Sequence, residues 1–290
     1  MLIEPAHQRA TEGSPAVTDP KLHYLAVNGL QVAWTSVGEA STSPLVFLHG
    51  LGDSAIITLR PIATHPAMAG TPALLIDLPG FGYGSATDDW TSSVEEQTEV
   101  VIQLLDTVGV VDAPIMGHSM GGSIAIQLAT RRPDLVSSLI LAEPLLHPDQ
   151  SVLGRTIAKR TESDFVSRGY AMLQLATRRQ AARGERASVG FQEPLGHANP
   201  VILHRAASSL LQQRSPSFGE QLEVLANPRT LLVGEMSNLD LGNLVPRDVG
   251  IVRIPDAGHS MMSENPDGFA RAIAAVLGNY TANTDGMETR

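Results

Sequence analysis

Ile115-Met116-Gly117-His118-Ser119-Met120-Gly121-Gly122 is the stretch that decides the fold, because it places a serine between glycines at the end of an apolar run. Residues 113–116 predict a buried strand and residues 123–132 predict a helix. In such a sharp turn a Cβ atom at a flanking position would collide with neighbouring backbone, which only glycine avoids. The turn exposes the Ser119 hydroxyl beside the free N–H groups of a helix N-terminus, where negative charge is stabilised. The stretch therefore predicts a nucleophilic serine, and the alternative is a chance turn rich in glycine and serine.

The composition indicates a globular protein with a large core. The chain has 290 residues, of which 43% are hydrophobic, and its net charge of −10 argues against nucleic acid or an anionic membrane as a partner. The absence of cysteine excludes disulfides, thiolate metal sites and a cysteine nucleophile. No basic segment followed by an apolar one opens the chain, and no apolar run approaches the ~20 residues of a membrane span. We therefore expect no signal peptide, no membrane span and a cytoplasmic location.

Strands and helices alternate along most of the chain. Asn28-Gly29, between residues 22–27 and 31–37, is typical of a two-residue hairpin. Further strands are predicted at 45–48, 73–76, 113–116, 136–142, 230–233 and 250–254. Helices are expected near Ser54 and between the later strands. This order predicts an α/β fold with a mostly parallel sheet covered by helices on both faces.

Two helix starts carry capping residues. Ser92-Ser93-Val94-Glu95 fits a capping box, in which a serine and a glutamate satisfy backbone N–H groups at the helix start. Asn265 and Pro266 fit the cap and the first position of the closing helix.

The α/β pattern lapses between residues 147 and 225, where helical periodicity continues without a clear strand. Residues 151–214 hold ten Lys or Arg against four Asp or Glu, a net charge of +6 in an acidic chain. We predict an inserted helical cap at 147–225. The remaining segments are predicted to be a core at 21–146 and 226–280 and flexible tails at 1–20 and 281–290.

The basic residues of this segment allow two interpretations. They are Arg155, Lys159, Arg160, Arg168, Arg178, Arg179, Arg183 and Arg186. They form a solvated or ion-paired helix surface, as charge runs usually do, or part of the cluster faces the pocket and steers an anionic or phenolic substrate toward Ser119.

His259 has the best context for a base among the nine histidines. It follows the strand 250–254 through a short loop, which places it at the carboxyl edge of the sheet beside Ser119. A surface histidine without a catalytic role is the alternative. His118 and His49 are expected to hold loops by hydrogen bonds. The others show no metal-ligand spacing, so we expect no metal and no cofactor.

Four motifs occur in an order that resembles a known family. They are His49-Gly50, Asp77-Leu78-Pro79-Gly80-Phe81-Gly82, the stretch around Ser119, and Gly258-His259. Over about residues 21–280 the chain resembles the α/β-hydrolase superfamily with a cap domain. The resemblance implies an oxyanion hole built from the N–H of Met120 and one N–H from Leu51 or, as second choice, Gly50. Each such donor is typically worth about 3 kcal/mol to a tetrahedral intermediate.

The acid that orients His259 departs from the usual pattern. Most relatives carry an aspartate shortly after the strand at 230–233, where this chain has Ser237, and Asp240 lies three residues further on. Glu143, at the end of the strand after the helix that follows Ser119, is the preferred candidate. A minority of the superfamily places the acid there, including fungal lactonases that open resorcylic macrolactones. Glu235 and Asp256 are the remaining candidates.

These residues predict a serine hydrolase that cleaves a carboxylic ester or lactone, with Ser119 as nucleophile, His259 as base and Glu143 as acid. The same triad also fits a C–C bond hydrolase or an acyltransferase, and a non-catalytic ligand-binding homologue is a further alternative. Dehalogenases and epoxide hydrolases of this fold carry an aspartate at the nucleophile position, which disfavours them. The sequence names neither the substrate nor the oligomeric state.

Overall fold

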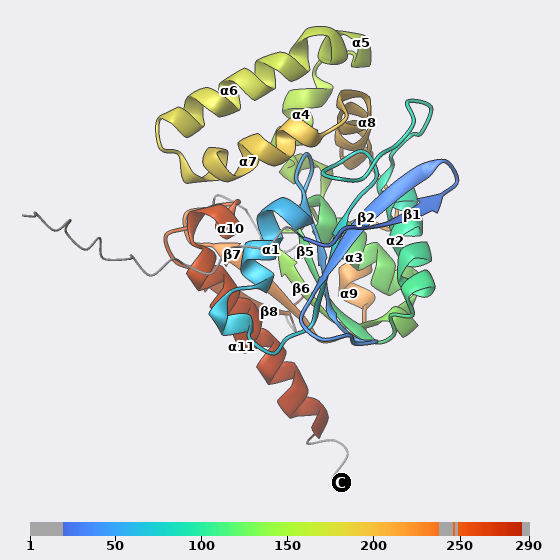
Figure 1. Ribbon diagram of the computed structural model, residues 1–290, viewed down its shortest axis with the longest axis vertical. Coiled ribbons are helices and arrows are strands. Elements are labelled where there is room, and N and C mark those ends of the chain that lie inside the picture. The colour runs from blue at the N-terminus through green and yellow to red at the C-terminus, as the bar shows by residue number, and fades with distance from the viewer. Residues whose placement is uncertain (1–19, 238–245, 247–248, 286–290) are drawn as a thin grey trace, which may run out of the picture.

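A computed structural model describes residues 20–237, 246 and 249–285. The strands of this part of the chain form one sheet (Figure 1). Their bounds are β1 His23–Val27, β2 Leu30–Val37, β3 Leu45–Leu48, β4 Ala73–Asp77, β5 Ala113–His118, β6 Val136–Ala142, β7 Arg229–Gly234 and β8 Gly250–Ile254. Asp240 lies outside the described residues, as do the predicted N-terminal tail up to residue 19 and the last five residues.

The sheet has eight strands in the order β1-β2-β4-β3-β5-β6-β7-β8. β1 pairs antiparallel with β2, and β2 with β4, whereas the remaining neighbours are parallel. The predicted hairpin turn is present, with φ of 50° at Asn28 and 83° at Gly29, as a turn with two left-handed residues requires. The predicted α/β fold class, with its mostly parallel sheet, is confirmed.

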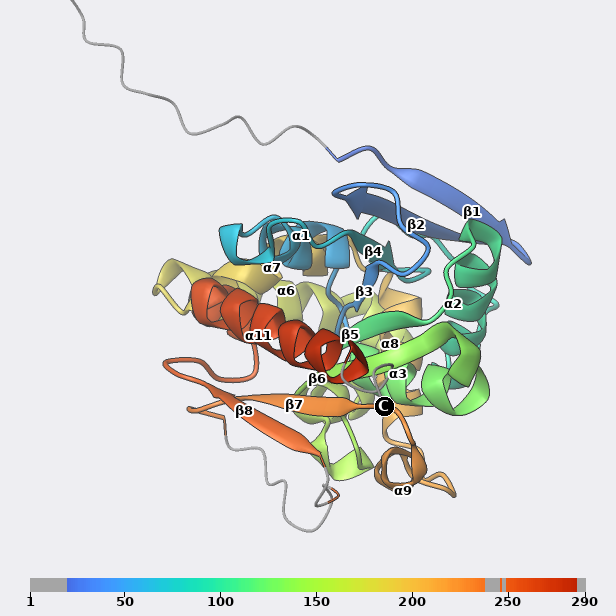
Figure 2. The same ribbon diagram turned by 90° about the horizontal axis from the view of Figure 1, so that it is seen from below.

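Helices cover both faces of the sheet (Figure 2). One face carries α2 Val94–Val108, α3 Met120–Arg131 and α9 Phe218–Val224, and the other carries α1 Arg60–Ala63, α10 Met261–Glu264 and α11 Pro266–Asp285. The central strand β3 is apolar at every position because both of its faces are covered. Along β3, Val46 and Leu48 pack on the side of α2 and α3, whereas Leu45 and Phe47 pack on the side of α11.

The start of α2 corrects one prediction. The capping box is formed by Ser93 and Glu96, not by Ser92 and Glu95, so the predicted register was wrong by one residue. The Ser93 hydroxyl accepts from the N–H of Glu96 at 3.2 Å, and Ser92 is left-handed with φ of 54°. The Ser92 hydroxyl instead accepts from the side chain of Gln97 at 3.1 Å. Because two serines and two glutamates are adjacent in the sequence, either register of the capping box is possible. In the register that forms, Ser92 makes the additional hydrogen bond with Gln97.

The closing helix α11 begins as predicted and ends later. The Asn265 side chain accepts from the N–H of Gly268 at 2.9 Å, and Pro266 is the first residue of the helix. The helix continues to Asp285, past Tyr280, after which the sequence predicted a polar tail.

Helices α4 to α8 form a layer over the carboxyl ends of the parallel strands, at the top of Figure 1. This helical layer, residues 152–210, consists of α4 Val152–Ala158, α5 Glu162–Asp164, α6 Tyr170–Ala182, α7 Arg186–His197 and α8 Pro200–Leu210. The segment predicted as a cap, 147–225, also includes α9, but α9 packs against α3 with Phe218 and Leu222 buried in the core. No strand in the sequence marks this return to the core, so periodicity alone did not separate α9 from the layer.

The helical layer touches the core closely at two glycines. A Cβ atom on Gly80, in the loop after β4, would lie 2.5 Å from a methyl carbon of Ile202. On Gly190 of α7 it would lie 1.9 Å from the Ser263 hydroxyl in α10. Since no side chain fits at either contact, these glycines set how closely α8 approaches the loop after β4 and α7 approaches α10.

Candidate active site

Ser119 occupies the turn between β5 and α3 in a left-handed conformation, with φ of 52° and ψ of −116°. A conformation of this kind costs about 1–3 kcal/mol in a residue with a side chain, and tight packing around the turn holds it. A Cβ atom on Gly117 would lie 2.4 Å from the carbonyl oxygen of Gly121. On Gly121 it would lie 2.3 Å from that of Leu48. The turn therefore presents Ser119 at the carboxyl edge of the sheet, where it lines a cavity.

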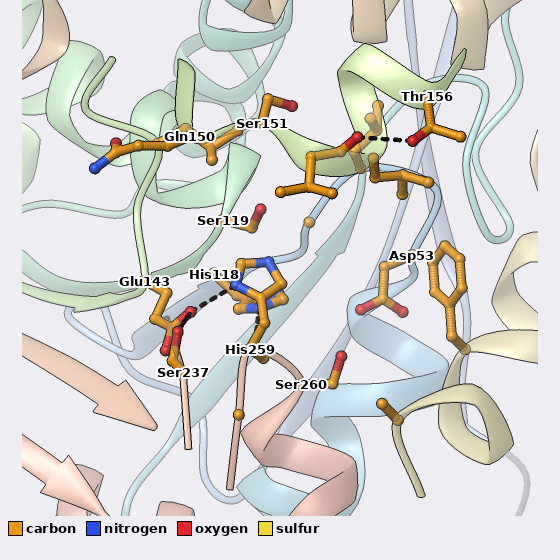
Figure 3. A pocket seen from close by; sticks show the side chains of 18 of the residues that line it. Asp53, His118, Ser119, Glu143, Gln150, Ser151, Thr156, Ser237, His259 and Ser260 are labelled. Carbon is orange, nitrogen blue, oxygen red and sulfur yellow. Dashed lines mark hydrogen bonds and ion pairs between the residues drawn. The ribbon is translucent and has the colours of Figure 1, made fainter. Parts of the chain in front are cut away.

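His259 lies beside Ser119 in this cavity and contacts Glu143 (Figure 3). Its Nδ1 is 2.8 Å from Oε2 of Glu143, whose side chain is only 1% exposed. An ionised carboxylate only accepts hydrogen bonds, so Nδ1 of His259 carries the ring proton. Nε2 of the neutral ring is then free to take up a second proton. The imidazole is thus oriented as a general base requires.

Glu143 is held at the end of β6 by donors from the neighbouring strand. The N–H of Gly234 donates to its Oε1 at 3.0 Å, and the Ser237 hydroxyl donates to its Oε2 at 3.0 Å. Ser237, at the position where the resemblance implied an acid, therefore supports a carboxylate from another strand. Such donors offset the cost of burying a charge.

The other candidate acids make no contact with His259 in the part of the chain that the structure describes. Glu235 and Asp256 are exposed, and neither forms a hydrogen bond or ion pair with His259. Asp240 lies outside the described residues.

The loop after β3 lies against Ser119. A Cβ atom on Gly50 would be 3.3 Å from that of Ser119. His49 holds the loop, because its Nδ1 donates to the carbonyl of Gly50 at 2.8 Å and its Nε2 accepts from the N–H of Leu78 at 3.1 Å. Burial lowers the pKa of His49, in keeping with this neutral form. Within the described residues the N–H groups of Gly50 and Leu51 make no hydrogen bond, and Met120, first in α3, has no intrahelical acceptor.

His118 contacts both the backbone and the ring of His259. Its Nε2 lies 3.0 Å from the carbonyl oxygen of His259, and the two rings are 4.8 Å apart. Since a carbonyl only accepts, Nε2 carries the proton. Burial and the neighbouring His259 lower the pKa of His118 to about 3, so the ring stays neutral when His259 becomes charged. His118 and His49 thus bond to neighbouring loops, as expected from the sequence.

The cavity has a volume of about 1080 Å³ and lies between the sheet edge and the helical layer. Its apolar lining comes from both: Leu51, Leu145, Val152, Leu153, Leu173, Ala187, Phe191 and Met236. A space of this size accommodates a substrate much larger than a short-chain ester.

Asp53 is a cavity residue that the sequence did not single out. It is 6% exposed, and burial raises its pKa to about 7. It directly follows His49-Gly50-Leu51-Gly52, and this glycine-rich loop was the available sequence signal for a residue near the site. A loop has no periodicity that would mark Asp53 as buried.

The predicted basic cluster mostly does not face the cavity. Among its members in the described chain, only Arg155 lines the cavity. Arg160 and Arg168 pair with Asp164 at 2.6 and 2.9 Å, and Arg186 donates to the carbonyl of Asp256 at 2.9 Å. The observed contacts therefore fit a paired and solvated helix surface better than a charged pocket wall.

The residues that the structure describes contain no group of three or more His, Cys, Asp or Glu side chains that could hold a metal ion. None of their helices combines the length and the apolar character needed to cross a membrane.

Known proteins resemble this chain in sequence and in fold. The esterase Rv0045c of Mycobacterium tuberculosis is 26% identical over 268 residues, spanning 82% of this chain and 83% of that protein. A dihydrolipoyllysine-residue acetyltransferase component of the acetoin cleaving system of Pseudomonas putida is 33% identical over 133 residues, 46% of this chain but 35% of that protein. A thermophilic esterase from Thermogutta terrifontis has a TM-score of 0.71 at 20% identity, covering 90% of this chain and 99% of its own. The sequence profile of the alpha/beta hydrolase family matches residues 45–272, most of the chain, and this protein therefore belongs to that family.

Proposed function

We propose that this protein is a serine hydrolase that cleaves a carboxylic ester or lactone through an acyl-enzyme. One observation carries the proposal: the 2.8 Å contact between His259 Nδ1 and the buried Glu143 carboxylate, in the cavity that Ser119 also lines. A base oriented by a buried acid beside a strained serine is the arrangement that activates a hydroxyl nucleophile.

The first half of the reaction forms the acyl-enzyme. The Ser119 hydroxyl attacks the ester carbonyl carbon while its proton moves to Nε2 of His259, and the carbonyl electron pair moves onto oxygen. Glu143 stabilises the resulting imidazolium. The tetrahedral intermediate collapses, the bond to the leaving oxygen breaks, and that oxygen takes the proton from His259 as the alcohol departs.

The oxyanion of this intermediate needs donors close to Ser119. The N–H of Met120 at the start of α3 is one, and the loop beside Ser119 offers Leu51 or Gly50 as the second. The lack of protein acceptors for the two loop N–H groups within the described residues supports this role, because such groups are then ready for a ligand oxygen.

The second half of the reaction uses water. His259, 49% exposed at its side chain, takes a proton from a water molecule that attacks the acyl carbon, and Ser119 leaves with the proton returned. This exposure favours hydrolysis over transfer to another acceptor, because water reaches the base. The Mycobacterium tuberculosis relative is named an esterase, which agrees with this choice.

A fluorophosphonate probe tests the nucleophile directly. We expect it to label Ser119 and not Ser260, a serine that lines the same cavity. Ser119→Ala should abolish both labelling and hydrolysis of p-nitrophenyl esters while the circular dichroism spectrum stays unchanged, because the lost hydroxyl leaves no buried cavity. An Ser119→Ala variant with near wild-type turnover, or an unlabelled wild-type protein, would contradict the proposal and favour a ligand-binding role.

Esters and lactones of graded size then define the substrate class. A panel from short p-nitrophenyl esters to large-ring lactones is suited to a cavity of about 1080 Å³. We expect kcat/KM to rise with the size of the apolar group.

A further inference from the structure

Asp53 is a carboxylate in the cavity that the proposed catalysis does not use. It stands three residues after Gly50, in the loop beside Ser119, and lines the same cavity. In Figure 3 its carboxylate lies on the side of His259 opposite Glu143. It is close enough to His259 for the two charges to interact.

The protein supplies few donors to this carboxylate. The N–H of Ser54 donates to its Oδ1 at 2.8 Å. The Thr58 hydroxyl also contacts it, but that hydroxyl donates to the carbonyl of Ser54 at 2.6 Å. No Lys or Arg forms an ion pair with Asp53 among the residues that the structure describes. Part of the hydrogen-bonding capacity of Asp53 is therefore left to the cavity.

The nearby carboxylate of Asp77 shows the contrast. It accepts from the Ser54 hydroxyl at 2.8 and 2.9 Å, from the N–H of Ile56 at 3.1 Å and from that of Tyr83 at 3.0 Å. Asp77 thus fixes the loop after β4, whereas its negative charge makes ionisation of Asp53 harder. Holding this loop accounts for the buried carboxylate of Asp77. It does not account for the side of the Asp53 carboxylate that faces the cavity.

We propose that Asp53 binds a hydroxyl group of the substrate, so that the enzyme selects esters or lactones with an alcohol or phenol near the scissile carbonyl. The inference rests on the proposed function, because it assumes that the ester binds at Ser119. The hydroxyl must be near the carbonyl because Asp53 belongs to the same short loop as the Gly50 and Leu51 oxyanion donors. Asp53 acts here as a specificity-determining residue.

The surroundings favour a hydroxyl over a cationic group. Arg155 lines the same cavity and opposes the entry of a cation. The apolar cavity wall also makes burial of a charged ligand costly. A hydroxyl donates to a carboxylate and accepts from a carboxylic acid, so it binds Asp53 in either form.

Matched esters test the inference. The probes are p-nitrophenyl hexanoate and the p-nitrophenyl esters of 2-, 3- and 6-hydroxyhexanoic acid, and the measured quantity is the ratio of kcat/KM for each hydroxylated ester to that for the parent. Dividing the wild-type ratio by that of a variant cancels the intrinsic reactivity of each ester. We expect Asp53→Leu to lower the ratio for the 2- or the 3-hydroxy ester by about tenfold, as one lost hydrogen bond to a charged or polar group does. The ratio for the 6-hydroxy ester, whose hydroxyl is far from the carbonyl, should stay unchanged.

Two further variants control the experiment. Asp53→Asn keeps the size and an acceptor for Ser54, so it should fold and lower the ratio less, by about threefold. Asp149→Asn changes another cavity carboxylate, whose side chain is 88% exposed, and should leave the ratio unchanged.

The outcomes separate this inference from the proposed function. An unlabelled and inactive wild-type protein overturns the proposed function. If the wild type is labelled by fluorophosphonate and cleaves the esters, but no ratio falls in either Asp53 variant, Asp53 does not bind the hydroxyl. An equal loss for parent and hydroxylated esters also contradicts the inference, because it shows a general role in the site.

Discussion

Glu143 and Asp53 are buried carboxylates that line one cavity on opposite sides of His259, but their surroundings differ (Figure 3). Glu143 has the imidazole of His259, the Ser237 hydroxyl and the N–H of Gly234 as partners. Asp53 has the N–H of Ser54, a shared hydroxyl and no cation among the described residues. A carboxylate with its partners inside the protein can orient a base, whereas one with few partners is suited to a ligand.

The backbone explains this difference. Glu143 follows β6, where the adjacent strand β7 ends in Gly234 and brings an N–H and then Ser237 to the carboxylate. Asp53 lies in a loop whose nearest donors, at Ser54 and Ile56, are largely committed to Asp77. The sheet therefore supplies one acid with donors, and the loop does not supply the other.

Loss of the Glu143 charge should have the largest effect. We expect Glu143→Gln to lower kcat for p-nitrophenyl esters by about 10³–10⁴-fold, because the amide no longer stabilises the imidazolium and can orient the wrong tautomer. The exposed Glu235→Gln is the matched control and should retain wild-type kcat. Asp240→Asn should also do little. A crippled Asp240→Asn with an active Glu143→Gln would show that Asp240 is the acid.

Moving the acid tests whether a carboxylate at position 237 can replace that of Glu143. In Glu143→Gln/Ser237→Asp we expect kcat to recover by about tenfold or more over Glu143→Gln, because Ser237 already contacts the oxygen that binds His259. Glu143→Gln/Ser237→Asn provides the uncharged control. Equal rates for the two double variants would mean that a carboxylate at position 237 does not reach the imidazole.

The same comparison shows what the sequence could and could not predict. Local motifs were enough to place Ser119 and His259 at the carboxyl edge of the sheet, since Ser119 directly follows β5 and a short loop joins β8 to His259. The acid was left open between Glu143 and Asp240, because only the pairing of β6 with β7 brings Glu143 to Ser237. Asp53 was missed because the burial of this loop depends on contact with the distant helical layer: a Cβ atom on the adjacent Gly52 would lie 3.2 Å from a ring carbon of Phe191. Contacts between distant segments leave no periodic pattern in a single sequence.

Ionisation of the Asp53 carboxyl should lower the free energy of unfolding at neutral and alkaline pH. Its folded pKa of about 7 is above the ordinary value of 3.8, so the folded state binds the proton more tightly. Stability therefore falls as pH rises from about 4 to about 7, and the loss, at most about 4 kcal/mol, is complete above that range. We expect Asp53→Asn to raise the free energy of unfolding relative to wild type at about pH 8 and much less at about pH 4.

Urea denaturation at the two pH values measures this effect. Asp149→Asn, at an exposed carboxylate, should change stability little at either pH. A pH-independent difference between Asp53→Asn and wild type would mean that the Asp53 carboxylate is not held in an unfavourable environment.

The smallest expected effect concerns long-range charge, where the basic helical layer contrasts with the two carboxylates below it. Arg160 and Arg168 are paired with Asp164, and among the cluster only Arg155 lines the cavity within the described residues. Steering by exposed charge is screened over ~10 Å at about 0.1 M salt. We therefore expect kcat/KM for an anionic ester, p-nitrophenyl hemisuccinate, to fall by no more than about threefold with added salt, whereas that for neutral p-nitrophenyl butanoate stays constant. Arg155→Gln should weaken this salt response and Arg168→Gln should not. Equal salt responses for the two esters would leave the basic residues with a structural role and no part in substrate capture.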